Sequence, residues 1–253
     1  MTMAGTMIHL VIAVRIAENI KKNGYKIRLA DGSNIHFDKN MFIAGNICPD
    51  GIMERKNYER NMKLHTHFRD GIPDGDFGKN GTIKVFEKRM ADFWREHCED
   101  ERVASGLYLG YITHMMTDKR FILYERPKYF QNISKIGLTE RDRETFVYFN
   151  KDTDLVDFKL VKEMPELSEA EKILRETRDY YIKNMITKEE LDKSRRWIIK
   201  YFFEEKHIEE NSRFLDYNSI LKFCGDTVNY ILDRLKHESY LDVKAYDKYP
   251  LDN

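Results

Sequence analysis

The sequence predicts an all-α protein, a multi-helix bundle built as one domain. Apolar residues recur at three- and four-residue spacing along most of the 253 residues, which is the period of amphipathic helices. Only 13 glycines and 5 prolines interrupt this pattern, and 34% of the residues are charged beside 42% hydrophobic ones, a composition that excludes disordered and collagen-like chains. We expect a single domain over residues 1–253, in which a helical half at about 126–253 packs on a half at about 7–125.

The N-terminal half begins with a clear helical pattern. Isoleucines and valines form one apolar face along residues 7–22, and Asn23-Gly24 then predicts the end of that helix. Residues 24–40 are compatible with a short hairpin or with an irregular excursion. The apolar run that follows stops at residues 48–51, where a proline and a glycine force a bend, and the glycines of residues 69–81 predict a loop.

Further helical patterns start at Thr82. The first covers about residues 82–94, and the second runs from Val103 to Asp118 and is predicted to end at Lys119-Arg120. Beyond Pro127, more helices are expected over residues 139–150, 167–184, 187–206 and 214–238. The last three of these open with the N-cap candidates Ser168, Thr187 and Asp216.

Charge and cysteine content narrow the function classes. Lys+Arg and Asp+Glu are both 43, so no global positive field attracts nucleic acid or an anionic membrane. The three cysteines, Cys48, Cys98 and Cys224, form no paired motif, which predicts reduced thiols and a cytoplasmic location. Arg15 and Glu18 interrupt the N-terminal apolar stretch, so neither a signal peptide nor a transmembrane segment is expected.

The sharpest chemical pattern is His114, followed four residues later by Asp118 in an apolar helix. This spacing places both side chains on one helix face, where they can bind a single cation. An isolated pair of this kind is more often a core histidine beside a carboxylate. Burial of an ionised aspartate is costly unless a partner or a metal compensates, so the apolar surroundings favour a site.

Weaker patterns supply further candidate ligands. His65 and His67 would point the same way if their segment is extended, and either can be a ligand. His9 lies on the apolar first helix, where a lone histidine is more often a core residue. Asp50 lies at a bend, a common place for a turn or N-cap aspartate. Together with the first pair, these residues form a set of nitrogen and oxygen donors suited to Zn²⁺.

These motifs resemble, in the same order, those of the zinc-dependent phospholipase C family, which is related in fold to single-strand nucleases with a trinuclear zinc site. The matching segments are Met7-Ile-His9-Leu-Val-Ile-Ala, Phe42-Ile-Ala-Gly-Asn-Ile-Cys-Pro-Asp50, Thr66-His67-Phe68 and Gly110-Tyr-Ile-Thr-His114-Met-Met-Thr-Asp118. They cover about residues 7–120. The Thr-His-Phe match favours His67 over His65 as the ligand.

The resemblance implies a phospholipase C-like bundle and a zinc-dependent phosphoric ester hydrolase. By this likeness Asp50, His67, His114 and Asp118 hold one zinc, and Asp118 bridges to a second zinc that His9 also binds. Asp50 would in addition act as general base toward a metal-activated water. The implied substrate is a small phosphoester or a phospholipid head group.

The chain departs from the family at the third zinc, whose ligands are a histidine soon after the His-x-x-x-Asp motif and a later His-x-x-x-Glu pair. Here Asp118 is followed by no histidine until His207. Glu125, or His207 with Glu210, are conjectural substitutes, and a solvated acidic face is the plainer interpretation of this last segment.

This loss motivates a second hypothesis, a non-catalytic member of the family that acts as a metal-stabilised interaction module. A nuclease is the third hypothesis, and the balanced charge disfavours it.

Overall fold

The computed structural model describes residues 3–79 and 81–242, and the predicted all-α class is confirmed, with 67% helix and 4% strand. The elements in chain order are α1 (Thr6–Lys22), β1 (Lys26–Arg28), β2 (Asn34–Ile35), α2 (Lys39–Ile47), the 3₁₀ helix η1 (Cys48–Glu54), α3 (Arg60–Thr66), α4 (Thr82–His97), the 3₁₀ turn η2 (Cys98–Asp100), α5 (Glu101–Ala104), α6 (Leu107–Ser134), α7 (Arg143–Glu163), α8 (Glu166–Glu176), α9 (Lys188–Ile198), the π-helical turn η3 (Ile199–Glu204), α10 (Tyr217–His237) and β3 (Leu241–Asp242).

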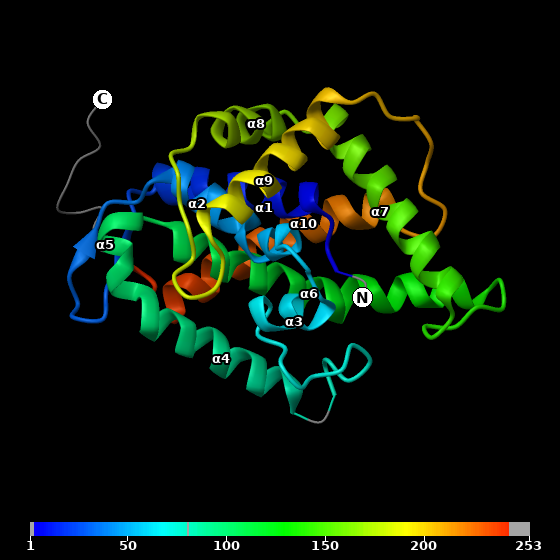
Figure 1. Cartoon of the computed structure of the whole chain (residues 1–253), viewed down its shortest axis with the longest axis horizontal. Coiled ribbons are helices and arrows are strands. Elements are labelled where there is room, and N and C mark those ends of the chain that lie inside the picture. The colour runs from blue at the N-terminus through cyan, green and yellow to red at the C-terminus, as the bar shows by residue number, and fades with distance from the viewer. Residues whose placement is uncertain (1–2, 80, 243–253) are drawn as a thin grey trace.

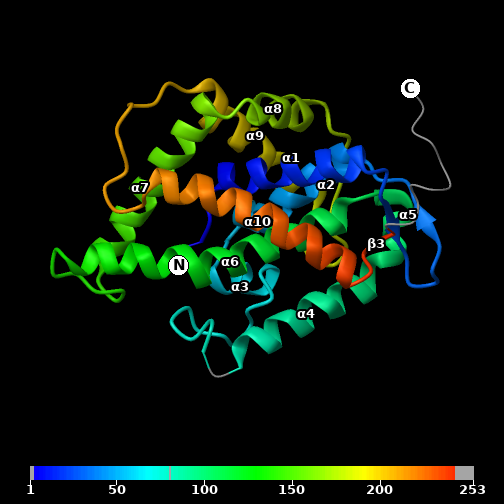
Figure 2. The same cartoon turned by 180° about the vertical axis from the view of Figure 1, so that it is seen from behind.

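Helix α1 lies in the centre of the molecule. Every residue from Met7 to Val14 is buried, which is expected only of a helix covered on all sides. It packs against α2, α6, α7, α8 and α10. Figure 1 shows α8 and α9 above α1 and α6 below it, and the view from behind shows α10 crossing it (Figure 2). The predicted helix over residues 7–22, ending at Asn23, is therefore confirmed as a core element.

Helices α2 and α6 approach until their backbones touch. A Cβ atom added at Gly45 would lie 1.9 Å from the carbonyl oxygen of Leu107, and one added at Gly110 would lie 2.0 Å from that of Phe42. Only glycine fits such a contact. The chain passes from α2 directly into η1, because Pro49 is tolerated in the first turn of a helix. This arrangement places the residues of η1 beside α6.

Buried carboxylates cap the two longest buried helices of the N-terminal half. Glu101 accepts hydrogen bonds from the backbone N–H groups of Gly106 (2.6 Å) and Leu109 (2.8 Å) where α6 begins. Asp157 of α7 accepts one from the N–H of Met7 (3.2 Å) where α1 begins. These acids satisfy N–H groups that have no partner within their own helix. Burial raises the pKa of Glu101 to about 7 and that of Asp157 to about 8.

The segment after α1 is a hairpin, one of the two alternatives that the sequence left open. Strands β1 and β2 pair antiparallel, with Ile27 opposite Ile35. Strand β3 adds to the other edge of β1, with Leu241 opposite Ile27, and so brings a distant part of the chain to the end of α1. The local pattern gave no sign of β3, because its pairing with β1 joins segments that are far apart in the sequence.

Helix α6 does not end at Lys119-Arg120 as predicted but continues through Pro127 to Ser134. Tertiary contacts use both basic residues inside the helix. The Lys119 ammonium donates to Glu87 (2.8 Å) and Tyr230 (2.7 Å), and the Arg120 guanidinium donates to Thr227 (3.1 Å). Basic residues at this point therefore join α6 to α4 and α10 and do not mark its C-terminus.

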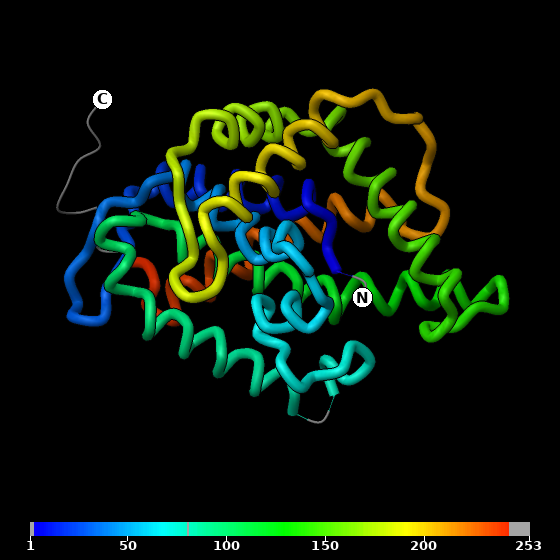
Figure 3. Tube along the Cα trace, in the orientation of Figure 1, coloured from blue at the N-terminus to red at the C-terminus, as the bar shows by residue number. Residues whose placement is uncertain are grey.

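The C-terminal helices differ from the prediction mainly in their lengths. Ser168 is not an N-cap, because α8 already begins after Pro165 and ends at Glu176. A long connection follows, which runs away from α8 and returns to α9 (Figure 3). Helix α7 extends to Glu163, beyond the predicted residue 150.

The other two predicted caps are confirmed. Thr187 accepts a hydrogen bond from the N–H of Glu190 (3.3 Å) as part of a capping box, and Asp216 accepts one from Ser219 (2.6 Å). All three cysteines are buried and free of disulfides. Within the described ranges, no helix has the combination of length and apolar character that a bilayer crossing requires.

Candidate metal centre

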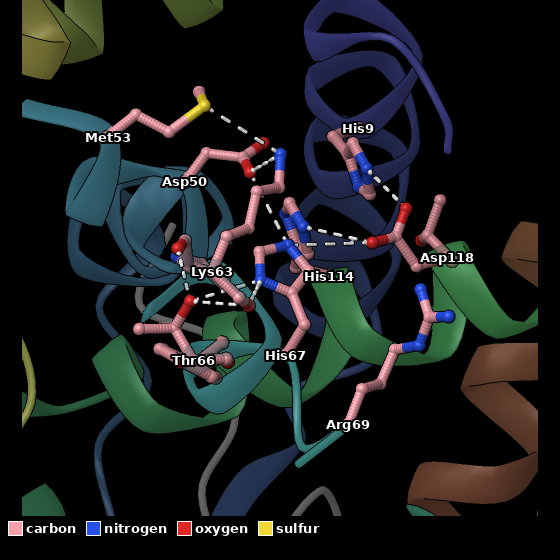
Figure 4. A network of polar contacts seen from close by, with 12 residues as sticks. His9, Asp50, Met53, Lys63, Thr66, His67, Arg69, His114 and Asp118 are labelled. Atoms are coloured by element: carbon pink, nitrogen blue, oxygen red, sulfur yellow. Dashed lines mark hydrogen bonds and ion pairs between the residues drawn. The ribbon is translucent and has the colours of Figure 1, made fainter. Parts of the chain in front are cut away.

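The structure brings together the five side chains that the sequence singled out (Figure 4). They come from four segments that are distant in the sequence, namely His9 on α1, Asp50 on η1, His67 directly after α3, and His114 with Asp118 on α6. All are buried except Asp50, whose side chain is 23% exposed. The close contact of α2 with α6 puts Asp50 next to His114, and the central position of α1 adds His9.

His114 and Asp118 lie one turn apart on the face of α6 that points into the centre. The His114 Nδ1 lies 2.7 Å from the backbone oxygen of Asn46, so the ring donates to this carbonyl and leaves Nε2 as a lone pair. That Nε2 atom lies 3.5 Å from Asp118 Oδ2. A histidine held through Nδ1–H to a backbone carbonyl is typical of metal ligands, because the bond sets both the tautomer and the ring orientation.

His67 is held in the same way, through a different carbonyl. Its Nδ1 lies 2.9 Å from the backbone oxygen of Lys63, one helical turn earlier. Its Nε2 points into the centre, 3.4 Å from Asp50 Oδ1 and 3.7 Å from Asp118 Oδ2. The two histidines of α6 and α3 therefore present equivalent lone pairs to the same space.

His65 lies outside the centre. The expectation that an extended segment would point His65 and His67 the same way is wrong, because residues 60–66 form helix α3. In a helix, side chains two positions apart diverge, so the His65 side chain is 63% exposed and pairs with Asp70 (2.7 Å).

His9 completes the group from the side of α1. Its Nε2 lies 3.2 Å from Asp118 Oδ1, and its ring stacks on that of His114 with centroids 3.7 Å apart and an interplanar angle of 2°. Burial, together with the neighbouring His114, lowers the pKa of His9 to about 4. The ring is therefore neutral at pH 7, which is the form that binds metals.

Besides His9 Nδ1, three donor atoms in the centre are buried and lack a hydrogen-bond partner among the described residues, namely His67 Nε2, His114 Nε2 and Asp118 Oδ2, and a fourth, Asp50 Oδ1, has the Lys63 ammonium at 2.5 Å. Their N···O separations of 3.4, 3.5 and 3.7 Å are long for hydrogen bonds. Donors at about 2.0–2.2 Å from a tetrahedral zinc ion are themselves roughly 3.3–3.6 Å apart. The spacing therefore fits a shared metal ion better than direct contact between the side chains.

The donor atoms also fall into two overlapping groups in which all atoms lie within 4.8 Å of one another. One group is His9, His114 and Asp118, and the other is Asp50, His67 and His114. A cavity of about 20 Å³ lies beside them, lined in part by His9, Asp50 and His114 and covered by residues of α9. This volume is enough for one small occupant.

The two carboxylates of the centre are held in their charged form. Burial opposes ionisation of Asp118, but His114 and His9 outweigh it and lower the pKa of this carboxyl. Burial likewise opposes ionisation of Asp50, and Lys63 and His67 hold its pKa well below the usual range. Although burial of the His114 ring opposes its protonation, the carboxylates in turn raise its pKa. Two ionised carboxylates that converge on one place, one of them buried, favour a bound cation.

Two residues near the centre were missed by sequence reasoning. The Lys63 ammonium lies 2.5 Å from Asp50 Oδ1. The Asn46 amide, in the orientation that satisfies both of its polar atoms, donates to the backbone oxygen of His9 (3.0 Å) and accepts from the backbone N–H of His114 (3.2 Å). Each residue lies four positions before a predicted ligand, the spacing already noted for His114 and Asp118, and this was the available signal.

The conjectural ligands of a third zinc have other partners. Glu125 binds Lys128 (2.6 Å) and Ser219 (2.8 Å), and His207 stacks on Phe158 with centroids 3.6 Å apart. Glu210 pairs with Lys151 at 2.9 Å. Within residues 3–79 and 81–242, none of the three conjectural ligands belongs to a group of donors spaced for a metal ion.

Comparison with known protein families, with curated proteins and with solved structures finds no match for this chain. The likeness to zinc-dependent phospholipases therefore depends on the quoted motifs alone.

Proposed function

We propose that this protein is a metal-dependent hydrolase of phosphoric esters, similar to the zinc-dependent phospholipase C family, with zinc as the metal. The observation that carries the proposal is the convergence of three buried donor atoms without hydrogen-bond partners among the described residues, His67 Nε2, His114 Nε2 and Asp118 Oδ2, with the Asp50 carboxylate, at separations close to those between the ligands of a zinc ion. Hydrogen bonding does not explain why two aspartates and two imidazole lone pairs are buried together. A divalent cation does.

The donor set supports zinc in particular. Imidazole nitrogen and carboxylate oxygen are typical zinc ligands, and the three cysteines lie outside the groups of potential ligands. Zinc bound here would supply a Lewis acid for a phosphoryl oxygen and lower the pKa of a bound water toward about 7. The positive charge of the zinc ion would attract an anionic substrate, and phosphoric esters are anionic.

Asp118 is the residue best placed to join two ions. Its Oδ1 faces His9 and its Oδ2 faces His67 and His114, so each of its oxygens is placed to bind a different ion. We assign the first ion to Asp50, His67, His114 and Asp118, and a second ion to Asp118 and His9. The backbone oxygens of Asn46 and Lys63 orient the rings.

Asp50 has the role of a ligand in this proposal. It is ionised at neutral pH, since Lys63 and His67 overcome the effect of burial and lower its pKa. A carboxylate with a low pKa accepts a proton weakly. Its additional role as general base toward water stays a prediction.

The test begins with elemental analysis of the natively purified protein and of the variants Asp118→Ala and Asp118→Asn. We expect about two zinc ions per chain in the wild type and loss of both in each variant, with helical content unchanged by circular dichroism. The zinc-loaded wild type should then hydrolyse members of a panel of generic phosphoesters, and a chelator should remove that activity.

The outcomes separate the hypotheses. Absence of stoichiometric metal would contradict the metal centre and leave a polar core. Stoichiometric zinc without turnover of any phosphoester would favour the interaction module over the enzyme.

A further inference from the structure

Lys63 combines two features that a structural ion pair does not need. Its ammonium lies 2.5 Å from Asp50 Oδ1 and contacts the sulfur of Met53 at 3.8 Å, and its side chain is still 21% exposed. Of the three donors on the ammonium, one is used by Asp50, and sulfur is a weak acceptor for another. Figure 4 shows this ammonium beside Asp50, on the opposite side of the centre from Asp118.

The exposed side of Lys63 faces a pocket of about 340 Å³. The pocket is lined by Asp50 and Lys63, whose end we call the inner end, and by polar and aromatic side chains, among them Asn150, Thr153 and Trp197. A volume of this size accommodates a small molecule. The inner end of the pocket is therefore the place where such a molecule meets both the metal centre and a cation of the chain.

The remaining charged groups of the pocket restrict where an anion can bind. Arg60 stands in the wall but pairs with Asp74. Asp154 accepts a hydrogen bond from Tyr201 (3.2 Å), and Asp157 from the start of α1. Lys63 is therefore the cation of the lining that is open to an anion. The pocket suits a molecule with one anionic group, bound at the inner end.

Asp50 Oδ1 faces both the Lys63 ammonium and the position that a metal ion would take. It lies 3.4 Å from the His67 nitrogen that would bind the metal, and 2.5 Å from the Lys63 ammonium. A divalent ion held by Asp50 would compete with the ammonium for this one oxygen and would repel it. An anion that contacts both the metal and the ammonium removes the repulsion and supplies the acceptors that the ammonium lacks.

We propose that Lys63 is a substrate-binding residue whose ammonium binds a phosphate oxygen of the ester at the inner end of this pocket. The inference deepens the proposed function and rests on it. Helix α3 positions the residue for both tasks, because the Lys63 carbonyl holds His67 while its side chain reaches Asp50. Lys63 thereby supplies a fixed positive charge of the chain's own beside the metals.

The experiment measures the binding of inorganic phosphate to the zinc-loaded protein by isothermal titration calorimetry, after removal of unbound zinc. We compare the wild type with Lys63→Gln and Lys63→Arg, and with the matched control Lys88→Gln, whose lysine is exposed on α4. Zinc content and circular dichroism are recorded for each protein. We expect Lys63→Gln to retain its zinc and to bind phosphate at least tenfold more weakly. Lys63→Arg should recover most of the affinity, and the control should match the wild type.

Three results would overturn the inference. These are unchanged phosphate affinity in Lys63→Gln, loss of zinc in both Lys63 variants, and failure of the zinc-loaded wild type to bind phosphate. The readout does not depend on turnover. Lysine-dependent phosphate binding without hydrolysis of any ester would support the Lys63 site and contradict the proposed enzyme, whereas hydrolysis with unchanged phosphate affinity in Lys63→Gln would do the reverse.

Discussion

Helix α6 has one buried acid at its start, Glu101 of the preceding helix α5, and another, Asp118, within it, and the pKa values of the two acids shift in opposite directions although burial acts to raise both. At its start, Glu101 accepts backbone N–H groups, and burial raises its pKa to about 7. Three turns later, Asp118 lies among imidazoles, and these outweigh burial and lower its pKa. The first acid completes the hydrogen bonding of a helix start, whereas the second keeps a charge and a buried oxygen without a hydrogen-bond partner. Buried acids therefore mark a site only when their oxygens face other ligands.

The largest expected effect concerns the candidate metal centre, to which Asp118 belongs. His67→Ala should lower zinc affinity at least about 100-fold and reduce any hydrolysis to background, because it removes a donor, a larger loss than that of a supporting partner. Zinc affinity is measured by competition with a chromogenic chelator. The matched control is His65→Ala, two residues away and exposed, which should leave zinc affinity unchanged. Equal losses in the two variants would contradict the assignment.

A second prediction concerns Gly110, which lies on α6 between the two acidic regions. Gly110→Ala places a methyl group 2.0 Å from the Phe42 carbonyl oxygen, so α2 must move away from α6. We expect a loss of about 3 kcal/mol in the free energy of unfolding, measured with urea, and weaker zinc binding, because Asp50 follows α2. Gly75→Ala is the control, since its Cβ meets no described atom within 4 Å. A stability equal to that of the wild type would contradict the close helix contact.

A third prediction concerns Glu101, the acid at the start of α6, and the pH dependence of the free energy of unfolding. The folded-state pKa of Glu101 is raised to about 7, so between pH 4.5 and 7 the folded state keeps a proton that the unfolded state releases. The free energy of unfolding therefore falls as the pH rises through this window, by on the order of 3 kcal/mol from this group. Glu101→Gln should remove that decrease, as seen in urea titrations at pH 5 and 7.5. Zinc content should not change, and an unaltered pH dependence would contradict the assignment.

The smallest effect is expected at a helix start that uses a hydroxyl group. Thr187→Ala removes the cap of α9 and should cost about 1 kcal/mol of unfolding free energy, with no change in the cost between pH 5 and 8, because threonine does not ionise. The measurement is again urea unfolding, with zinc analysis beside it. A cost that depends on pH would contradict the view that only an ionisable cap, such as Glu101, makes the stability of a helix start depend on pH.

Local pattern predicted most of the long helices, but it did not predict α3 or β3, nor the partners against which the elements pack. The apolar period of residues 7–22 predicted α1, and the Thr66-His67-Phe68 motif selected the histidine that lies in the centre. Glu101 and Asp157 escaped notice because their partners are backbone N–H groups, which carry no residue signature. The length of α6 was underestimated for a related reason, since the residues that sustain it belong to α4 and α10, far away in sequence.

Within the candidate site, the side chains with metal-binding chemistry could be predicted, whereas the groups that orient them could not. Histidine and aspartate are recognisable in a sequence as potential metal ligands, so His9, Asp50, His114 and Asp118 could be proposed before any geometry was known. The backbone oxygens of Asn46 and Lys63 orient the rings of His114 and His67, and they do so through where they lie in space and not through residue type. Those positions follow only once α2 and α3 are packed against α6.

The order of the ligands along the chain has a consequence for synthesis. The donors end at Asp118, whereas α7–α10, which cover them and α1, occupy residues 143–237. At about 5–20 residues per second, a ribosome needs roughly 5–20 s to make that covering segment. When this interval begins, the nascent chain already carries every candidate donor of the centre, and Asp157, the acid that caps α1, is made within the interval. If the proposed centre binds metal, its capture can therefore precede closure of the fold.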